Sequence, residues 1–199
     1  MSFARIEKEP SPGGLCASCV EGSSFSLSSD IVGSMNLSIG QELSEQEYFK
    51  LKQIQERRDC RLKALDALSR REHGQNELKQ KLLLKGFSKE VIEMVLDELI
   101  EKKLLSDFRY ATMFIESRQR KNPEGRLLMS QRLASKGIDR ETVQKALDLL
   151  YSEEQTIEYV QKAYQLAKRK ADEQKALFML QKKGFSSYEI RLGLERLEG

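Results

Sequence analysis

The chain has 199 residues, of which 33% are charged and 39% hydrophobic, with a net charge of +3, no Trp and one His. No run of about 18 apolar residues occurs, which excludes a membrane-spanning helix, and a single His excludes most metal-site and catalytic-triad arrangements. Aromatic and β-branched clusters are few and Leu, Lys, Glu and Gln are abundant, so we expect an all-α protein rather than a β-sandwich or barrel.

The first 30 residues contain eight Ser, three Gly and two Pro, a composition that predicts a disordered tail over residues 1–30. Apolar residues alternate loosely over residues 31–43, which allows a short hairpin there. Ser44 and Glu47 then have the spacing of a capping box, so a helix is expected to begin at this point.

Three cysteines, an odd number, do not form a disulfide framework and indicate a reducing, cytoplasmic setting. Cys16 and Cys19 form a CxxC pair in the Ser/Gly-rich tail. A zinc site would need two more ligands, and only Cys60 and His73 remain. We therefore interpret Cys16 and Cys19 as incidental thiols and expect no metal and no cofactor.

An internal repeat is the most informative feature of the chain. A Lys-Gly pair occurs at Lys85-Gly86, Lys136-Gly137 and Lys183-Gly184, with glycines 51 and 47 residues apart. Five apolar positions recur at −4, +1, +6, +10 and +13 from each Gly, and the last three lie on one helix face. Their residues are Leu82, Phe87, Ile92, Leu96 and Leu99; Leu133, Ile138, Val143, Leu147 and Leu150; and Leu180, Phe185, Ile190, Leu194 and Leu197.

Each Lys-Gly pair is expected to end a helix, because a left-handed residue after a helix is usually Gly. A further helix precedes each pair, over about 44–72, 106–121 and 152–170. The prediction is a tandem array of three three-helix repeats, elongated and slightly curved, over 44–105, 106–151 and 152–199. One compact bundle is the alternative, but it would not require five matched positions per unit.

The charge alternates with this repeat. Residues 57–85, 117–136 and 161–183, which lead into the Lys-Gly pairs, each carry +5, whereas 86–107 and 137–160 carry −3 and −4. If the units stack in one orientation, the basic helices align into a stripe that suits an extended polyanion. The alternative is that these Lys and Arg residues only solvate exposed helix faces.

The candidate partner- or DNA-binding residues are the cations of the first two basic segments, with arginine favoured because its planar fork binds phosphate in a bidentate way. They are Arg70, Arg71, Lys79, Lys81, Lys85, Arg118, Arg120, Lys121, Arg126 and Arg132. Phe108, Tyr110 and Phe114 are expected in the core rather than as a base-stacking platform. No phosphate loop, HExxH or GxSxG motif occurs, so we expect no enzymatic activity and no catalytic residue.

Several segments of the chain resemble the RecX regulatory family, and they follow one another in the same order as in that family. They are residues 64–71 (ALDALSRR), Glu77-Leu78 and the Leu82–Gly86 stop; then Leu104–Asp107, Tyr110-Ala111 and Arg118; then Gly125–Leu133 and Lys136–Ile138. The resemblance covers residues 60–150 well and 151–199 more loosely, and it does not include the Ser/Gly-rich first 30 residues.

The resemblance implies a non-catalytic modulator, usually an inhibitor, of the RecA recombinase and its coprotease activity in DNA recombination, repair and the SOS response. Family members consist of tandem three-helix repeats that lie in the groove of the RecA–DNA filament. The expected partners are then the RecA filament and single- or double-stranded DNA phosphates, with no membrane and a monomeric chain. The alternative is a stand-alone, sequence-neutral DNA-binding helical-repeat protein.

Overall fold

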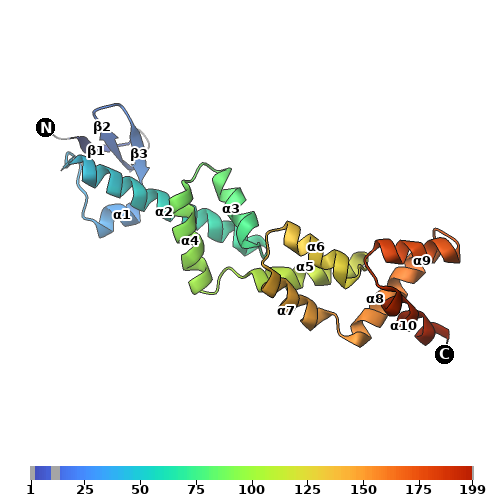
Figure 1. The fold of residues 1–199 in the computed structure, drawn as a ribbon. Coiled ribbons are helices and arrows are strands. Elements are labelled where there is room, and N and C mark those ends of the chain that lie inside the picture. Colours follow the sequence, from blue (N-terminus) through green and yellow to red (C-terminus); the bar gives the residue numbers. More distant parts are fainter. Residues whose placement is uncertain (1–2, 10–13, 199) are drawn as a thin grey trace. The chain divides into compact units, whose positions relative to one another are not determined.

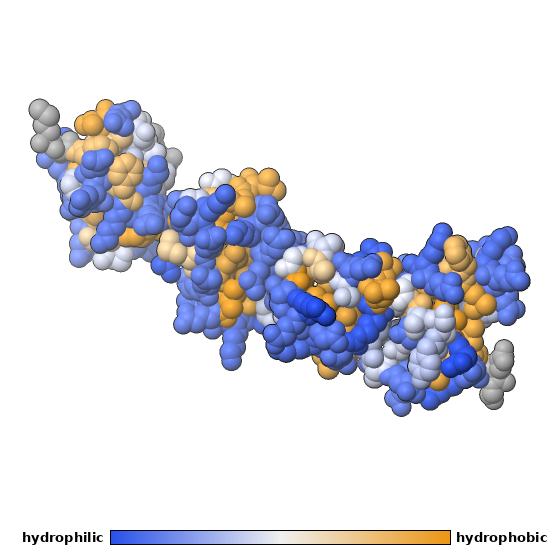
Figure 2. Space-filling view, in the orientation of Figure 1, coloured by the Kyte–Doolittle hydropathy of each residue, from blue (hydrophilic) through white to orange (hydrophobic). Residues whose placement is uncertain are grey.

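The computed structural model describes residues 3–9 and 14–198 and is mostly helical, as expected (Figure 1). The chain divides into two compact units, of which the first comprises Met1–Asp66 and Leu82–Glu98 and the second comprises Ala67–Lys81 and Leu99–Gly199. Among the described residues, no helix is long and apolar enough to cross a membrane. Hydrophilic residues cover most of the face drawn in Figure 2, in keeping with the charged composition.

A small antiparallel sheet at the start of the first unit corrects the prediction of a disordered tail. Strands β1 (Ala4–Lys8), β2 (Leu15–Cys19), β3 (Ser24–Leu27) and β4 (Glu42–Leu43) pair in the order β3-β2-β1-β4. Ala4, Ile6 and Ala17 on one face join a core with Tyr48 and Leu51 of helix α2 (Glu45–Arg70). The composition of this segment did not predict the sheet, because a strand covered by a helix on one face needs only small apolar residues at every second position. Residues 1–2 and 10–13 of the predicted tail lie outside the described residues.

The predicted hairpin over 31–43 is also wrong. Helix α1 (Ser29–Ser34) occupies its first part, and the chain then turns at Gly40, whose φ is +84°, into β4. Strand β4 pairs with β1, with Leu43 opposite Ala4, instead of with a local partner. Loose alternation in a short segment does not reveal such a long-range partner.

In the part of the chain that the structure describes, nine helices follow β4, in the order expected for three three-helix repeats. The first contains α2, α3 (Gln75–Leu83) and α4 (Lys89–Glu101), and the second contains α5 (Asp107–Lys121), α6 (Arg126–Ser135) and α7 (Arg140–Leu150). The third contains α8 (Glu153–Lys168), α9 (Glu173–Lys182) and α10 (Ser187–Glu198). The predicted capping box starts α2, because Glu47 Oε2 accepts from Ser44 N at 2.8 Å and Ser44 Oγ accepts from Glu47 N at 3.3 Å.

The Lys-Gly pairs end α3, α6 and α9 as predicted. Gly86, Gly137 and Gly184 have φ values of +87°, +82° and +83°. The amide of the residue after each Gly donates to the carbonyl four residues before that Gly, as in Phe185 N to Leu180 O at 3.3 Å. The amide of each Gly donates to the carbonyl three residues before it. These two bonds define a Schellman motif, and the left-handed residue between them explains the glycine.

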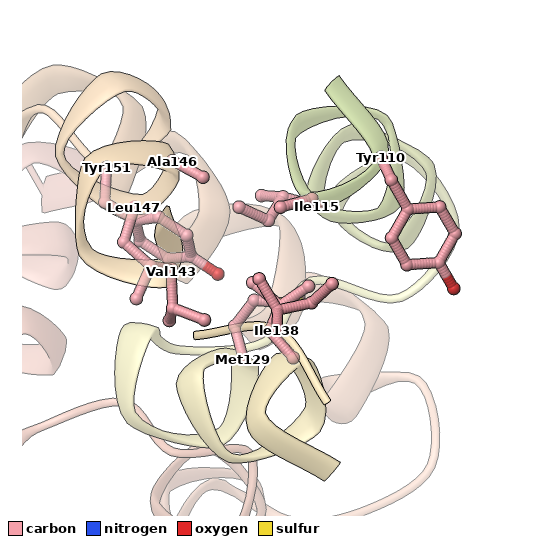
Figure 3. Packing of buried hydrophobic residues seen from close by; sticks show 10 residues of the cluster. Tyr110, Ile115, Met129, Ile138, Val143, Ala146, Leu147 and Tyr151 are labelled. Atoms are coloured by element: carbon pink, nitrogen blue, oxygen red, sulfur yellow. The ribbon is translucent and has the colours of Figure 1, made fainter. Parts of the chain in front are cut away.

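The repeat positions supply the cores of the second and third repeats. Leu133, Ile138, Val143 and Leu147 are buried with residues of α5 in one cluster, part of which is drawn in Figure 3. Leu180, Phe185 and Ile190 are buried with Val160 and Ala163 in another. Leu197 and Phe108 were also expected in the core, but they are 42% and 38% exposed. Leu197 lies in the last turn of α10 and Phe108 in the first turn of α5, where a helix has fewer neighbours to cover it.

Candidate partner and nucleic-acid interface

The middle helices of neighbouring repeats meet end to start within the second unit. At the end of α6, Lys136 O accepts from Asn76 Nδ2, in the first turn of α3, at 3.4 Å. At the end of α9, Lys183 O accepts from the amide of Gly125, which precedes α6, at 2.8 Å. A Cβ on Gly125 would lie 2.1 Å from Gly184 O, so the two backbones are in direct contact. The Lys-Gly turns therefore join the repeats as well as ending the helices.

The loop between α5 and α6 is held by a buried carboxylate. Glu124 is 2% exposed, and its carboxylate accepts from Arg118 Nη2 at 2.6 Å and from Arg132 Nε at 2.6 Å. The side chain of Gln119 binds both the amide and the carbonyl of Glu124, at 2.9 and 2.7 Å. The hydroxyl of Tyr151 also donates to Glu124 O at 2.9 Å. Because the carboxylate, the amide and the carbonyl of Glu124 are all bonded, the loop is held in place at this residue.

Six cations surround this loop, and we call them the loop cluster: Arg118, Arg120, Lys121, Arg132, Lys162 and Lys183. Lys162 Nζ donates to Arg120 O at 2.6 Å, and Lys183 Nζ donates to Asn122 Oδ1 at 2.6 Å. Among the described residues, Glu124 is the carboxylate that pairs with this cluster, and six cations against one carboxylate leave the cluster with a net positive charge.

The electrostatics of the cluster reflect partial burial. Burial lowers the pKa of Lys183, which the nearby Lys170 lowers further and the charge of Glu124 opposes. The side chains of Arg118 and Arg132 are 36% and 40% exposed although they bind Glu124. Arg118 Nε is buried and has no hydrogen-bond partner among the described residues. Partly exposed guanidinium groups such as that of Arg132 suit phosphate or carboxylate groups of a partner.

Comparison with known proteins gives consistent matches. Residues 60–99 match the family model described as "RecX, first three-helix domain", and residues 106–147 match "RecX, second three-helix domain". Regulatory protein RecX of Bacillus subtilis (strain 168) is 30% identical over 180 residues, which cover 87% of this chain and 68% of that protein. Regulatory protein RecX of Neisseria meningitidis (strain FAM18) is 36% identical over 140 residues, covering 69% of this chain and 90% of that protein. The chain belongs to the RecX family.

Solved RecX structures have the same fold. A crystal structure of regulatory protein RecX superposes with a TM-score of 0.73 at 22% identity and covers 98% of this chain and 100% of that one. RecX from Lactobacillus salivarius superposes with a TM-score of 0.63 at 25% identity and covers 72% and 97%. The family models cover the first two repeats, and the third follows from the repeat pattern and from α8, α9 and α10.

Four of the ten candidate residues lie in the loop cluster: Arg118, Arg120, Lys121 and Arg132. Arg126, although on α6, pairs with Asp148 of α7, and Arg71 pairs with Glu77. Lys81 contacts Nε2 of the buried His73 at 3.3 Å. Arg70 and Lys79 lie on α2 and α3 of the second unit, and each has interactions of its own. Lys85 is exposed in the first unit.

The sequence did not predict that Lys162 and Lys183 belong to the loop cluster. Lys183 stands in a Lys-Gly pair, which we interpreted only as a helix stop, and Lys162 lies in the third basic segment, from which no candidate was chosen. The recurrence of Lys immediately before all three glycines was the available signal, because a Schellman motif requires the glycine but not the lysine.

Proposed function

We propose that this RecX family protein modulates the RecA recombinase, as an inhibitor of its recombinase and coprotease activities, by binding as a monomer in the groove of the RecA–DNA filament. The loop cluster carries the proposal. It places six cations around the α5–α6 loop, next to middle helices that follow one another end to start. A positive surface on a repeat array suits a partner that is itself a repeating polyanion.

DNA phosphates are the proposed secondary contacts. Each phosphate that a Lys or Arg neutralises releases counterions, so affinity gains from an exposed cation even without base recognition. Arg120 and Lys121 lie at the C-terminal end of α5, and both are exposed. They are better probes than Arg118 and Arg132, whose removal would also disturb the buried Glu124.

A stand-alone, sequence-neutral DNA-binding activity is the second candidate. The observation that favours it is the same net positive charge, which attracts DNA phosphates with no help from a recombinase. The two functions differ in whether RecA has to be present for tight binding.

The test measures RecA-dependent ATP hydrolysis on single-stranded DNA in the presence of the protein. We expect Arg120→Gln combined with Lys121→Gln to weaken inhibition. The matched control, Lys145→Gln with Lys175→Gln, removes the same charge from exposed lysines outside the cluster and should inhibit normally. Equal inhibition by both double variants would refute a role for the loop cluster, and no inhibition by the unmodified protein would refute the regulatory proposal.

Binding to labelled single-stranded DNA without RecA separates the two candidates. Direct phosphate contact makes log affinity fall with log salt by about 0.7 per phosphate, so the cluster variant should have a slope shallower by about 1.4 if both residues contact phosphates. Tight RecA-free binding with that slope change favours the stand-alone activity. Weak RecA-free binding, together with strong inhibition of RecA, favours the filament.

A further inference from the structure

A hollow in the second unit combines aromatic and cationic side chains. It measures about 340 Å³ and is lined by Tyr110, Met113, Phe114 and Ser117 of α5 and by the charged residues Arg71, Glu72, Glu77 and Lys136. Its size falls at the lower end of the range for small-ligand pockets. The loop cluster does not include these eight residues, and the proposed function leaves the hollow without a role.

One wall of the hollow is apolar. Tyr110 and Phe114 lie one turn apart on α5 with stacked rings, whose centroids are 6.3 Å apart and whose planes differ by 28°. Figure 3 shows the ring of Tyr110 projecting from α5 away from Leu147 and Tyr151. Met113 is 51% exposed beside them. Tyr110 is only 7% exposed, so Phe114 and Met113 form the accessible part of this wall, an apolar, polarisable surface on which a planar ring can stack.

The other wall is charged, with Arg71 and Lys136 beside the carboxylates of Glu72 and Glu77. Lys136 Nζ lies 4.9 Å from the ring centroid of Phe114 and 5.9 Å from that of Tyr110. Within the described part of the chain, the Lys136 side chain makes no ion pair. The nearby Glu77 pairs with Arg71, which lowers the pKa of that carboxyl, and the charge of Lys136 lowers it further. A ligand carrying an anionic group next to a planar ring would satisfy both walls.

We propose that this hollow binds one unstacked base of single-stranded nucleic acid. The base stacks against Met113 and Phe114, with the buried Tyr110 ring supporting Phe114 from behind, and its phosphate lies at Lys136. An apolar side chain of a protein partner would fill the same wall but leave the lysine without an anion, so the charge favours a nucleotide. The site rests on the proposed contact with DNA and adds base contact to it.

The absence of Trp from the chain provides a direct probe. Met113→Trp places a single Trp in the hollow at a half-exposed position that tolerates the larger ring. An oligonucleotide of thymidines should quench its fluorescence, whereas an abasic oligonucleotide of the same length and charge should bind without quenching. Binding of both oligonucleotides with no quenching by either would overturn the base site.

Affinity gives an independent test with a matched control. Phe114→Leu keeps an apolar side chain against the core but removes the ring, and should weaken thymidine-oligomer binding at least about fivefold while leaving abasic binding unchanged. Phe178→Leu removes another ring with a lysine over it, Lys182 Nζ at 4.6 Å, from a 55% exposed position outside the hollow, and should bind normally. Equal losses in the two variants would overturn the proposal.

Fluorescence anisotropy of labelled oligonucleotides distinguishes failure of the proposed DNA contact from failure of the base site alone. If neither oligonucleotide binds, the proposed DNA contact fails and the base site fails with it. If both bind with equal affinity and Phe114→Leu has no effect, the DNA contact stands and only the base site is refuted.

Discussion

The glycines that end α3, α6 and α9 allow helix termination to be separated from repeat packing. Alanine at Gly86, Gly137 or Gly184 would adopt the same left-handed conformation, which costs about 1 kcal/mol at each site. The surroundings differ. Among the described residues, nothing lies within 4 Å of a Cβ on Gly86, whereas a Cβ on Gly137 would lie 2.8 Å from Asn76 Nδ2, at the end of a side chain that can rotate.

Gly184 has the most crowded surroundings of the three. Its added Cβ would lie 2.7 Å from the backbone amide of Leu128, which cannot move without displacing α6. Such overpacking costs about 1–3 kcal/mol beyond the backbone strain. We therefore expect the loss of unfolding free energy to rise from Gly86→Ala, at about 1 kcal/mol, through Gly137→Ala to Gly184→Ala, at about 2–4 kcal/mol.

Urea melts followed by circular dichroism measure the total loss, and hydrogen exchange with mass spectrometry assigns it to particular helices. The exchange of α6 and α9 should accelerate in Gly184→Ala, and that of α3 and α4 in Gly86→Ala. Equal losses at the three sites would refute the inference that the Lys-Gly turns join the repeats, and would leave them a capping role alone.

Three further predictions concern single side chains. Arg118→Ala should destabilise the protein by about 1–2 kcal/mol in a urea melt, because it leaves the buried Glu124 with Arg132 alone, whereas Arg120→Ala should have almost no effect. Cys60 should resist alkylation at pH 8 while the half-exposed Cys16 reacts, because burial raises the pKa of the Cys60 thiol to about 11 and keeps it protonated; mass spectrometry of the labelled peptides would reveal the reverse order. The Thr142 hydroxyl and amide hold the pKa of Asp139 below 3.8, so this carboxylate stabilises the fold above that pH and loses its effect as the pH falls through the lowered value. Asp139 is the N-cap residue of α7. Asp139→Asn should accordingly lower the melting temperature at pH 7 but not in strong acid, and a constant difference would contradict this role of the carboxylate.

Much of the helical array could be predicted because its signals are local. Glycines at three equivalent positions specified the left-handed stops, and apolar residues at fixed offsets specified which face of each helix is buried. The capping box at Ser44 marked the start of α2 for the same reason, since all its bonds lie within four residues.

The candidate site was predicted only in part, because a charge in the sequence does not reveal its partner. Arg118 and Arg126 each contribute one positive charge to the same basic segment, so the sequence does not distinguish them. Arg118 binds a buried carboxylate in the loop cluster, whereas Arg126 pairs with Asp148 on a neighbouring helix. The ring of Tyr110 was expected in the core, and it is buried there, but it also lines a hollow whose other walls come from distant parts of the chain.

The amino-acid order by itself therefore determined the repeat, the helix ends and the family, since each depends on residues close together along the chain. Only the tertiary structure decided that a serine-rich segment forms a sheet, because its small apolar residues become a core only where α2 covers them. It also decided which cations gather around the α5–α6 loop, because Lys162 and Lys183 reach that loop from another repeat.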